Sequence, residues 1–405
     1  MTIGTRFFIR THLMVAALSV ALPAVGYAQI GNGSSGLVAG TMAAGPNSVS
    51  SSREPSGPGL SRLPLTTPDR MPYDTTTGTP QPSNSPGTSA PPAVDGQAYG
   101  SAPEKWPYTI SRVAVSGPPG PGTITQWVPV TSKPFRFTGK LWVRFGSSWF
   151  VCTASLIKRG VLVTAAHCVH NYGEGAGGFA DEVRWYPANA GASGPWSYFS
   201  GLSWRVPTPY VNGTDTCSVT GVICNNDIAT VTLATRSGQY AGQILGGFYN
   251  YGWNAWGFVL SPAFGNHWIS DLTQLGYPVA IDNGEHMLRG SSFAKYIQST
   301  GTNAKILKNY QLGSAMTGGS SGGPWLSNFG TTPGITGAAS LGMFSSQNVV
   351  SAVTSWGYTT VGVNVQGASY FGQNAEFPNA AYGAYGAGNI GKLVQDTCTA
   401  SPAYC

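Results

Sequence analysis

The chain has 405 residues, of which only 9% are charged, whereas glycine (56), proline (29) and aromatic residues (12%) are abundant. Soluble proteins usually have about a quarter charged residues, so this composition disfavours a helical intracellular protein and favours an extracellular all-β protein rich in turns. The net charge of +6 arises from a scarcity of acids, and the absence of any Lys/Arg-rich run excludes a nucleic-acid footprint.

The N-terminus predicts a secretory signal peptide over residues 1–28. Arg6 and Arg10 precede an apolar stretch from Leu13 to Val25, and Gly26-Tyr27-Ala28 has small residues at the two positions that a signal peptidase reads. The apolar stretch falls short of the roughly 18 residues that a membrane span requires, which disfavours a retained anchor. We therefore expect cleavage after Ala28, a secreted or periplasmic protein, and no membrane span.

The next segment, residues 29–107, consists mainly of Ser, Thr, Pro and Gly with scattered polar residues. Runs such as Ser48–Ser52 and Pro80–Pro91 contain too little apolar surface to offset the conformational entropy lost on ordering, so we expect this segment to be disordered. The composition leaves open whether it is a propeptide, a linker or a tail.

Residues 108–405 have a different composition pattern. Short β-rich runs alternate with Gly, Asn, Ser and Pro, as in an all-β fold with hairpins. No long stretch carries a 3.6-residue apolar period, and no repeat occurs at a fixed spacing. We therefore predict one all-β domain made of two packed barrels with a cleft between them. Strands are expected at Lys140–Phe145, Trp149–Ile157, Val161–Thr164, Ile228–Leu233, Gly276–Ala280 and Val349–Thr354.

Six cysteines fit export to an oxidising compartment. Six cysteines allow fifteen pairings, and we adopt nearest-neighbour pairing as an interpretation. A zinc site is less well supported, because no CxxC or His-rich pattern accompanies them, and we expect neither a metal nor a cofactor. The expected couples are Cys152 with Cys168, Cys217 with Cys224, and Cys398 with Cys405.

The strongest indication of chemistry is the segment Gly318-Gly319-Ser320-Ser321-Gly322-Gly323-Pro324. A nucleophilic serine requires that its own N–H and that of the residue two before it converge on an oxyanion. Glycines permit the tight, partly left-handed backbone that this geometry needs. A structural Gly/Ser-rich loop is the alternative, and this chain has many such loops. We take Ser321 as the candidate nucleophile.

A second segment places His167 after the apolar run Val161–Thr164 and directly before Cys168. A disulfide from Cys168 to Cys152 would close a loop of about 16 residues, stabilise the fold by roughly 3 kcal/mol and fix the imidazole. A core histidine beside a structural disulfide would be the usual interpretation of this segment alone. Together with the serine segment, it favours catalysis.

A third segment places Asp227 at the start of the alternating run Ile228–Leu233, where a carboxylate can be buried against an imidazole and fix its tautomer. The other aspartates between the histidine and the serine lie in polar, turn-like contexts more typical of solvated carboxylates. We therefore favour Asp227 over these rivals, which are Asp181, Asp215, Asp271 and Asp282.

The strings TAAHC, NNDIA and GSSGGP, in this order, resemble the three active-site motifs of the chymotrypsin/trypsin superfamily over roughly residues 130–375. The resemblance implies two six-stranded antiparallel barrels, the first providing the histidine and aspartate and the second the serine. It implies that His167 is the general base, Asp227 its orienting partner and Ser321 the nucleophile. The N–H groups of Gly319 and Ser321 would form the oxyanion hole.

The resemblance also covers a disulfide, because Cys152 with Cys168 is similar to the one that brackets the catalytic histidine in the family.

Chain order tests another hypothesis, since the serine segment also satisfies the G-x-S-x-G nucleophile elbow of α/β-hydrolases. That fold needs its acid and histidine after the serine. No histidine follows Ser321, and Asp396 is the only aspartate that does, which excludes this alternative.

Two departures from the family concern activation. Ser320 stands where animal digestive members have an aspartate that pairs with a buried N-terminal amine, and no Ile-Val-Gly-Gly start is present. The chain is in this respect more similar to bacterial trypsin-like peptidases, which include glutamyl endopeptidases, and Leu275-Gly276-Tyr277-Pro278 resembles a strand of those enzymes. We expect residues 318–323 to be ordered by their own hydrogen bonds and neighbours.

The residues that would determine cleavage specificity also differ from the family pattern. Ala315 stands where Lys/Arg-cleaving members have aspartate, so a strong basic preference is not expected. Ser355-Trp356-Gly357 matches the substrate-binding strand, with Ser369-Tyr370-Phe371-Gly372 facing it, whereas Ser340-Leu341-Gly342 fits the usual spacing with a poorer match. Thr354 would replace the histidine that reads glutamate, which argues against glutamate specificity.

The sequence therefore predicts a monomeric serine endopeptidase that cleaves proteins or peptides through an acyl-enzyme. A catalytically inactive homologue that serves as a binding or adhesion module is the alternative, disfavoured because such proteins usually lose one residue of the triad. A third possibility is a surface protein in which residues 29–107 carry the function.

Overall fold

The computed structural model of the chain describes residues 37–41, 106–114, 125–191, 195–331, 344, 346–358, 364–378 and 386–405. The predicted signal peptide and most of residues 29–107 lie outside the described residues. The expectation of disorder is wrong for one short run, because β1 (Leu37–Thr41) pairs antiparallel with β8 (Phe199–Pro207). This apolar run, LVAGT, has the composition of a strand and adds to the edge that β8 offers.

The first barrel is a closed sheet of six antiparallel strands in the order β8-β11-β6-β5-β4-β7, and pairing of β7 with β8 closes it. Valine and leucine dominate its shortest strands, whose side chains are buried throughout. Such continuous burial is expected where a barrel interior lies on one face and the rest of the molecule covers the other. The strands are β4 (Thr138–Phe145), β5 (Ser148–Lys158), β6 (Val161–Thr164), β7 (Glu182–Pro187), β8 (Phe199–Pro207) and β11 (Ala229–Leu233).

The second barrel is also closed and antiparallel, in the order β14-β17-β18-β19-β16-β15, with β14 and β15 paired to close it. A stacked pair of rings, Phe258 and Tyr310, and the fully buried Trp325 occupy its core. The strands are β14 (His267–Gly276), β15 (Leu288–Thr300), β16 (Ile306–Gly313), β17 (Pro324–Ser327), β18 (Val349–Gly357) and β19 (Val365–Tyr370).

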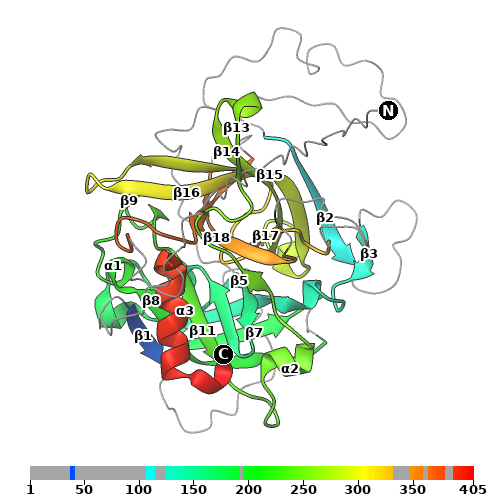
Figure 1. Ribbon diagram of the computed structural model, residues 1–405. Helices are drawn as coiled ribbons and strands as arrows, with labels where there is room; N and C mark the ends of the chain where they lie inside the picture. Colours follow the sequence, from blue (N-terminus) through cyan, green and yellow to red (C-terminus); the bar gives the residue numbers. More distant parts are fainter. Residues whose placement is uncertain are drawn as a thin grey trace, which may run out of the picture.

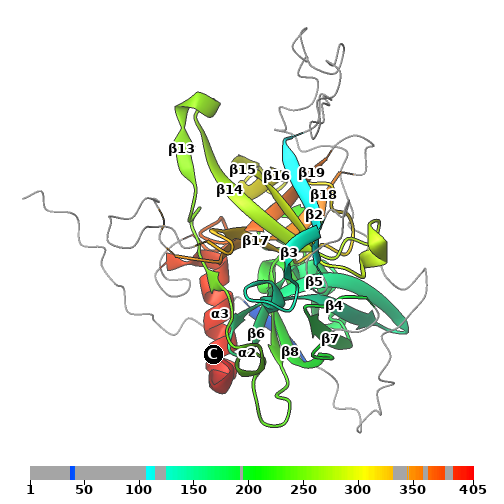
Figure 2. The ribbon, with the colours of Figure 1, turned by 90° about the vertical axis from the view of Figure 1, so that its right-hand side faces the viewer.

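Shorter elements are attached to the barrels (Figure 1). β13 extends β14 into a hairpin that projects from the second barrel (Figure 2), and β2 adds to β15. Helix α3 packs against β8 and β11 of the first barrel. These elements are β2 (Tyr108–Ala114), β3 (Thr125–Pro129), β9 (Cys217–Val219), β10 (Ile223–Cys224), β12 (Asn250–Tyr251), β13 (Val259–Ser261), α1 (Thr208–Val211), α2 (Ala241–Leu245) and α3 (Gly388–Ala400).

The predicted all-β class and two-barrel architecture are confirmed, with two local corrections. The strand predicted at Gly276–Ala280 is wrong beyond its first residue, because β14 ends at Gly276. Pro278 has no N–H for a ladder, and the Val279 N–H donates instead to the Gly318 carbonyl at 2.8 Å. Helix α3 was not predicted, since its buried side includes Asn389 and Lys392 and so lacks a clean apolar period.

Candidate active site

Two strands of the first barrel bring the predicted histidine and aspartate together. His167 lies in the short turn after β6, Asp227 lies just before β11, and the pairing of Ala229 with Thr164 places those two strand ends side by side. The Asp227 carboxylate accepts the backbone N–H of His167 at 2.8 Å through Oδ1, and its Oδ2 lies 2.7 Å from the ring Nδ1. The carboxylate therefore fixes both the backbone and the ring of the histidine.

The second barrel contributes a third contact to this carboxylate. The hydroxyl of Ser355, on β18, donates to Asp227 Oδ2 at 2.6 Å. Asp227 is 1% exposed, so its charge is held by hydrogen bonds rather than by water. Ser355 was predicted only as part of a substrate-binding strand, but its hydroxyl donates to Asp227.

Ser321 lies on the loop between β16 and β17, at the boundary of the barrels. Its carbonyl accepts the Thr153 N–H from β5 at 2.7 Å and lies 3.7 Å from Cys168 Sγ, so the loop is adjacent to the residue that follows His167. Ser321 Oγ and His167 Nε2 are both buried, and neither has a hydrogen-bond partner within the described part of the chain. Buried polar atoms without partners are costly, and these are the two atoms between which the predicted general base and nucleophile would exchange a proton.

The serine loop has the backbone that its glycines predict. Gly319 has φ +95° and Gly322 has φ +79°, both in the left-handed region. A Cβ on Gly322 would lie 2.0 Å from Thr164 Oγ1, and one on Gly319 would lie 2.4 Å from the Tyr277 carbonyl. Glycine is therefore required at both positions by conformation, and also by close approach of the first barrel at Gly322 and of the segment after β14 at Gly319.

Gly319 and Ser321 on this loop both have N–H groups that are free among the described residues. The Gly318 carbonyl accepts from Val279 N, which turns the N–H of the Gly318–Gly319 peptide to the opposite side, because the two groups of a trans peptide point apart. Among the described residues, neither Gly319 N nor Ser321 N donates a hydrogen bond, whereas Ser320 N and Gly322 N both do. The two free donors are those predicted for an oxyanion hole.

The predicted specificity residues lie around the end of β16 and along two paired strands. Ala315 follows β16, Ser355–Gly357 ends β18, and β19 pairs with β18, with Ser369 opposite Val353. The rival segment 340–342 lies outside the described residues. Trp356 is fully buried and its Nε1 donates to Asn309 Oδ1 at 2.7 Å.

A buried amide network beside Ala315 was not predicted from the sequence. Gln274 bonds Ser314 Oγ at 2.7 Å and Thr354 Oγ1 at 2.9 Å, and Gln366 Nε2 donates to the Met316 carbonyl at 2.7 Å. These partners are all uncharged, so the network offers no counter-charge for a basic side chain. Gln274 joins β14, and Gln366 joins β19, to the segment that precedes the serine loop. These contacts link residues far apart in the chain, so no local pattern in the sequence indicates them.

The three nearest-neighbour disulfides are confirmed as Cys152–Cys168, Cys217–Cys224 and Cys398–Cys405. Three disulfides and no free cysteine indicate a protein that folds in an oxidising compartment. No helix among the described residues has the length and apolar character needed to cross a membrane.

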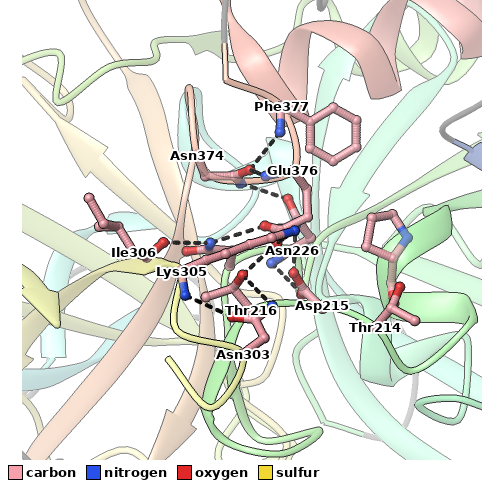
Figure 3. A network of polar contacts seen from close by, with 12 residues as sticks. Thr214, Asp215, Thr216, Asn226, Asn303, Lys305, Ile306, Asn374, Glu376 and Phe377 are labelled. Carbon is pink, nitrogen blue, oxygen red and sulfur yellow. Dashed lines mark hydrogen bonds and ion pairs between the residues drawn. The ribbon is translucent and has the colours of Figure 1, made fainter. Parts of the chain in front are cut away.

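One rival aspartate corrects the sequence interpretation. Asp215 was taken as a solvated carboxylate, but it is 4% exposed and binds the Asn226 backbone and side chain (Figure 3). Asp181 and Asp271 are exposed as expected, and the half-buried Asp282 pairs with Arg112 at 2.5 Å. Asp227 alone among these aspartates contacts His167 within the described residues.

Two closed six-stranded antiparallel barrels, with the histidine and aspartate on the first and the serine on the second, match the architecture that the three motifs imply. The chain has the fold of chymotrypsin-like serine proteases. No protein-family model and no curated protein matches the sequence.

Solved structures with a similar fold are bacterial and other proteases. The protease Anisep from Arthrobacter nicotinovorans is 23% identical, with 59% of this chain and 91% of that chain covered and a TM-score of 0.44. A thermostable serine protease AL20 from an extremophilic microorganism is 22% identical, with coverages of 58% and 91% and a TM-score of 0.42. A Glu endopeptidase is 14% identical, with coverages of 68% and 94% and a TM-score of 0.41.

Proposed function

We propose that this protein is a secreted serine endopeptidase with the catalytic triad His167, Asp227 and Ser321. The observation that carries the proposal is the pair of buried atoms without partners, Ser321 Oγ and His167 Nε2, beside a histidine whose other nitrogen is bound by a buried carboxylate. His170, a fully buried histidine outside this site, also has one nitrogen without a partner among the described residues, so the support comes from the free Nε2 of His167 together with the Asp227 contact at its Nδ1.

In the proposed mechanism His167 Nε2 takes the proton of Ser321 Oγ as the oxygen attacks the carbonyl carbon of a peptide bond. Asp227, which accepts from Nδ1 at 2.7 Å, keeps the other proton on that nitrogen and stabilises the imidazolium. The free N–H groups of Gly319 and Ser321 then bind the oxyanion.

Collapse of this intermediate breaks the C–N bond, and the imidazolium gives its proton to the leaving amine, which leaves an acyl-enzyme on Ser321. Water then enters, gives a proton to Nε2 and attacks the ester carbon. The C–O bond to Ser321 breaks, and the imidazolium returns the proton to Ser321 Oγ, which restores the serine and the neutral histidine. These steps require no group beyond the side chains and N–H groups named here.

The proposal is tested by Ser321→Ala, with labelling of the unmodified enzyme by a fluorophosphonate. We expect kcat to fall by a factor on the order of 10⁴ to 10⁶. The unfolding temperature should not fall, because Ser321 Oγ has no hydrogen bond to lose among the described residues. A protein without activated serine would not be labelled, which is the outcome expected of an inactive binding module.

Ser327→Ala is the matched control, because the Ser327 hydroxyl on β17 is also buried without a partner. We expect this variant to retain both labelling and activity. If Ser321→Ala keeps more than about a tenth of the activity, the loss is far smaller than removal of a nucleophile causes and the mechanism is wrong.

A further inference from the structure

Two carboxyl groups from different parts of the fold are buried together where the barrels meet (Figure 3). Asp215 lies in the connection from β8 to β11 of the first barrel and is 4% exposed. Glu376 follows β19 of the second barrel, and its side chain is 4% exposed. Neither residue belongs to the proposed triad, so the catalytic mechanism does not explain why they are buried.

Both carboxyl groups bind asparagines that directly precede Asp227, Asp215 binding Asn226 and Glu376 binding both Asn225 and Asn226. Asp215 accepts the Asn226 backbone N–H at 2.8 Å and its side-chain Nδ2 at 2.7 Å. Glu376 Oε2 accepts Asn225 Nδ2 at 3.1 Å and the same Asn226 Nδ2 at 3.3 Å. One donor therefore contacts both carboxyl groups, which keeps them close together.

The remaining polar atom of Asn226 is held from the C-terminal part of the chain. Asn226 Oδ1 accepts from Asn374 at 2.8 Å and from Asn389, on α3, at 3.2 Å. Asn226 is fully buried, so these contacts leave it little freedom to move. The residue before Asp227 is thus fixed by Asp215 from the first barrel, by Glu376 and Asn374 after β19 of the second, and by Asn389 of α3.

The positive charge around this pair is small. Lys305 Nζ lies 3.7 Å from Glu376 Oε1, but its side chain is 53% exposed and its charge is screened by water. Lys308 turns its ammonium to the Gln373 carbonyl at 2.7 Å. Thr216 Oγ1 donates to Glu376 Oε1 at 2.5 Å as a neutral group.

The other titratable neighbours remain uncharged near neutral pH. Burial, followed by the charge of Asp215, raises the pKa of Tyr172 to about 12. Burial raises the pKa of Tyr210 far above its ordinary range, with smaller contributions from Asp227 and Asp215. Burial and then the charge of Glu376 hold the pKa of the Asp215 carboxyl well above its usual range.

We propose that Glu376 is a positioning residue for the catalytic carboxylate, and that Asp215 is protonated beside it, so that loss of the Asp215 proton releases Asn226 and with it Asp227. This inference rests on the proposed triad and extends it to a part of the second barrel that touches neither substrate nor the reacting atoms. With the proton present, one negative charge and one neutral carboxyl share the asparagine donors. Without it, two like charges face each other in a buried site with one exposed cation.

The direction of the pH effect follows from the raised pKa. A carboxyl whose pKa is higher in the folded than in the unfolded protein binds more protons in the folded state. Its contribution to stability is therefore complete below its ordinary pKa of 3.8 and is lost as the pH rises through the folded-state pKa. The proposal consequently predicts an alkaline limb of kcat that belongs to this pair.

The experiment compares Glu376→Gln, Glu376→Ala and the unmodified enzyme in kcat, KM and unfolding temperature across the pH range. Glu376→Ala removes one acceptor from each asparagine, while Asn226 keeps Asp215 and Asn225 keeps the Ile306 carbonyl. We expect a loss in kcat of up to roughly 10²-fold with little change in KM, as for a small displacement of a catalytic group. Glu376→Gln keeps an acceptor oxygen but removes the charge. We expect it to restore most of kcat. Because the charge of Glu376 no longer raises the pKa of Asp215, the alkaline limb should move to lower pH.

Glu174→Gln is the matched control, because Glu174 is an exposed carboxylate with a single hydrogen bond, from Asn171 at 3.1 Å. Its pH profile should coincide with that of the unmodified enzyme. A Glu376→Gln profile that also coincides would overturn the role of the Asp215 proton, and an unchanged kcat in Glu376→Ala would overturn the positioning role.

Two further outcomes are distinguishable. If Glu376→Ala does not fold, the pH profile of Glu376→Gln decides the inference alone. If Ser321→Ala is inactive while both Glu376 variants behave as the unmodified enzyme, the inference fails and the proposed function stands. If Ser321→Ala remains active, the proposed function fails first, and with it the inference that rests on it.

Discussion

Replacing Asp227 with asparagine tests the tautomer on which the proposed mechanism depends. Asp227 accepts three hydrogen bonds, one at Oδ1 from the His167 backbone and two at Oδ2, from His167 Nδ1 and Ser355 Oγ. Asparagine has nearly the same shape but only one acceptor oxygen. With that oxygen toward the His167 backbone, its NH₂ group faces Nδ1, which must then be the acceptor. The ring proton moves to Nε2, the atom that should accept the proton of Ser321.

The reverse orientation of the amide would also be unfavourable. It would set the NH₂ group against the His167 backbone N–H, and an unsatisfied buried donor costs about 1–3 kcal/mol. We therefore expect Asp227→Asn to fold and to lose on the order of 10⁴ in kcat, as expected when a triad histidine has the wrong tautomer. At 1.36 kcal/mol for each tenfold change, this loss corresponds to about 5.4 kcal/mol of transition-state stabilisation.

The assay is steady-state hydrolysis of a peptide substrate at neutral pH, with thermal unfolding measured on the same samples. KM should change little, because Asp227 is buried behind the histidine. Asp181→Asn is the control, since that exposed carboxylate accepts only the Gly146 N–H and lies 3.7 Å from Arg144. A loss in Asp227→Asn below tenfold, in a variant that unfolds normally, would refute the role assigned to this carboxylate.

Two more predictions concern specificity and activation. Because Ala315 and the uncharged Gln274 network offer no carboxylate, cleavage of a peptide library should favour small, apolar or uncharged polar residues on the acyl side, and a profile dominated by Lys or Arg would contradict this. Chains that begin at different positions upstream of Tyr108, each with an extra N-terminal residue, should have equal kcat/KM. Activity confined to one free N-terminus would show that an inserted amine orders the site.

The parts of the site that were predictable are those fixed by neighbours in the sequence. Each triad residue lies in a short string whose flanking residues have a local task, as with Gly322, where even a methyl group would collide with Thr164. The disulfides were predictable for the same reason, because each joins cysteines separated by 7 or 16 residues. The barrels followed from β-rich runs separated by turns.

The parts that were missed depend on contacts between polar loops far apart in the chain. Thr216 and Glu376 are 160 residues apart, and nothing in the composition of either loop indicates that both are buried. Asp215 therefore resembled a solvated turn residue until its partners were known. Ser355 was assigned by its motif to a substrate strand, but the motif does not say where its hydroxyl points.

The order of the serine loop is explained by the packing of the two barrels. β5 of the first barrel gives two donors to it, Thr153 N to the Ser321 carbonyl at 2.7 Å and Thr153 Oγ1 to the Gly319 carbonyl at 2.8 Å. With both carbonyls bound on that side, the flanking peptides have little freedom to rotate, and the free N–H groups keep their direction. No incoming ammonium is needed for this.

Ser320, at the position where an ammonium would find its partner, donates its hydroxyl to the Thr317 carbonyl at 2.6 Å instead. Asp282, an alternative partner for such an ammonium, is already paired with Arg112 of β2. The segment upstream of the first barrel thus contributes a strand and a side-chain ion pair, and neither depends on a free N-terminus. Because an ammonium buried without a carboxylate would be strongly disfavoured, removal of residues before Tyr108 would uncover or release the enzyme rather than assemble its active site.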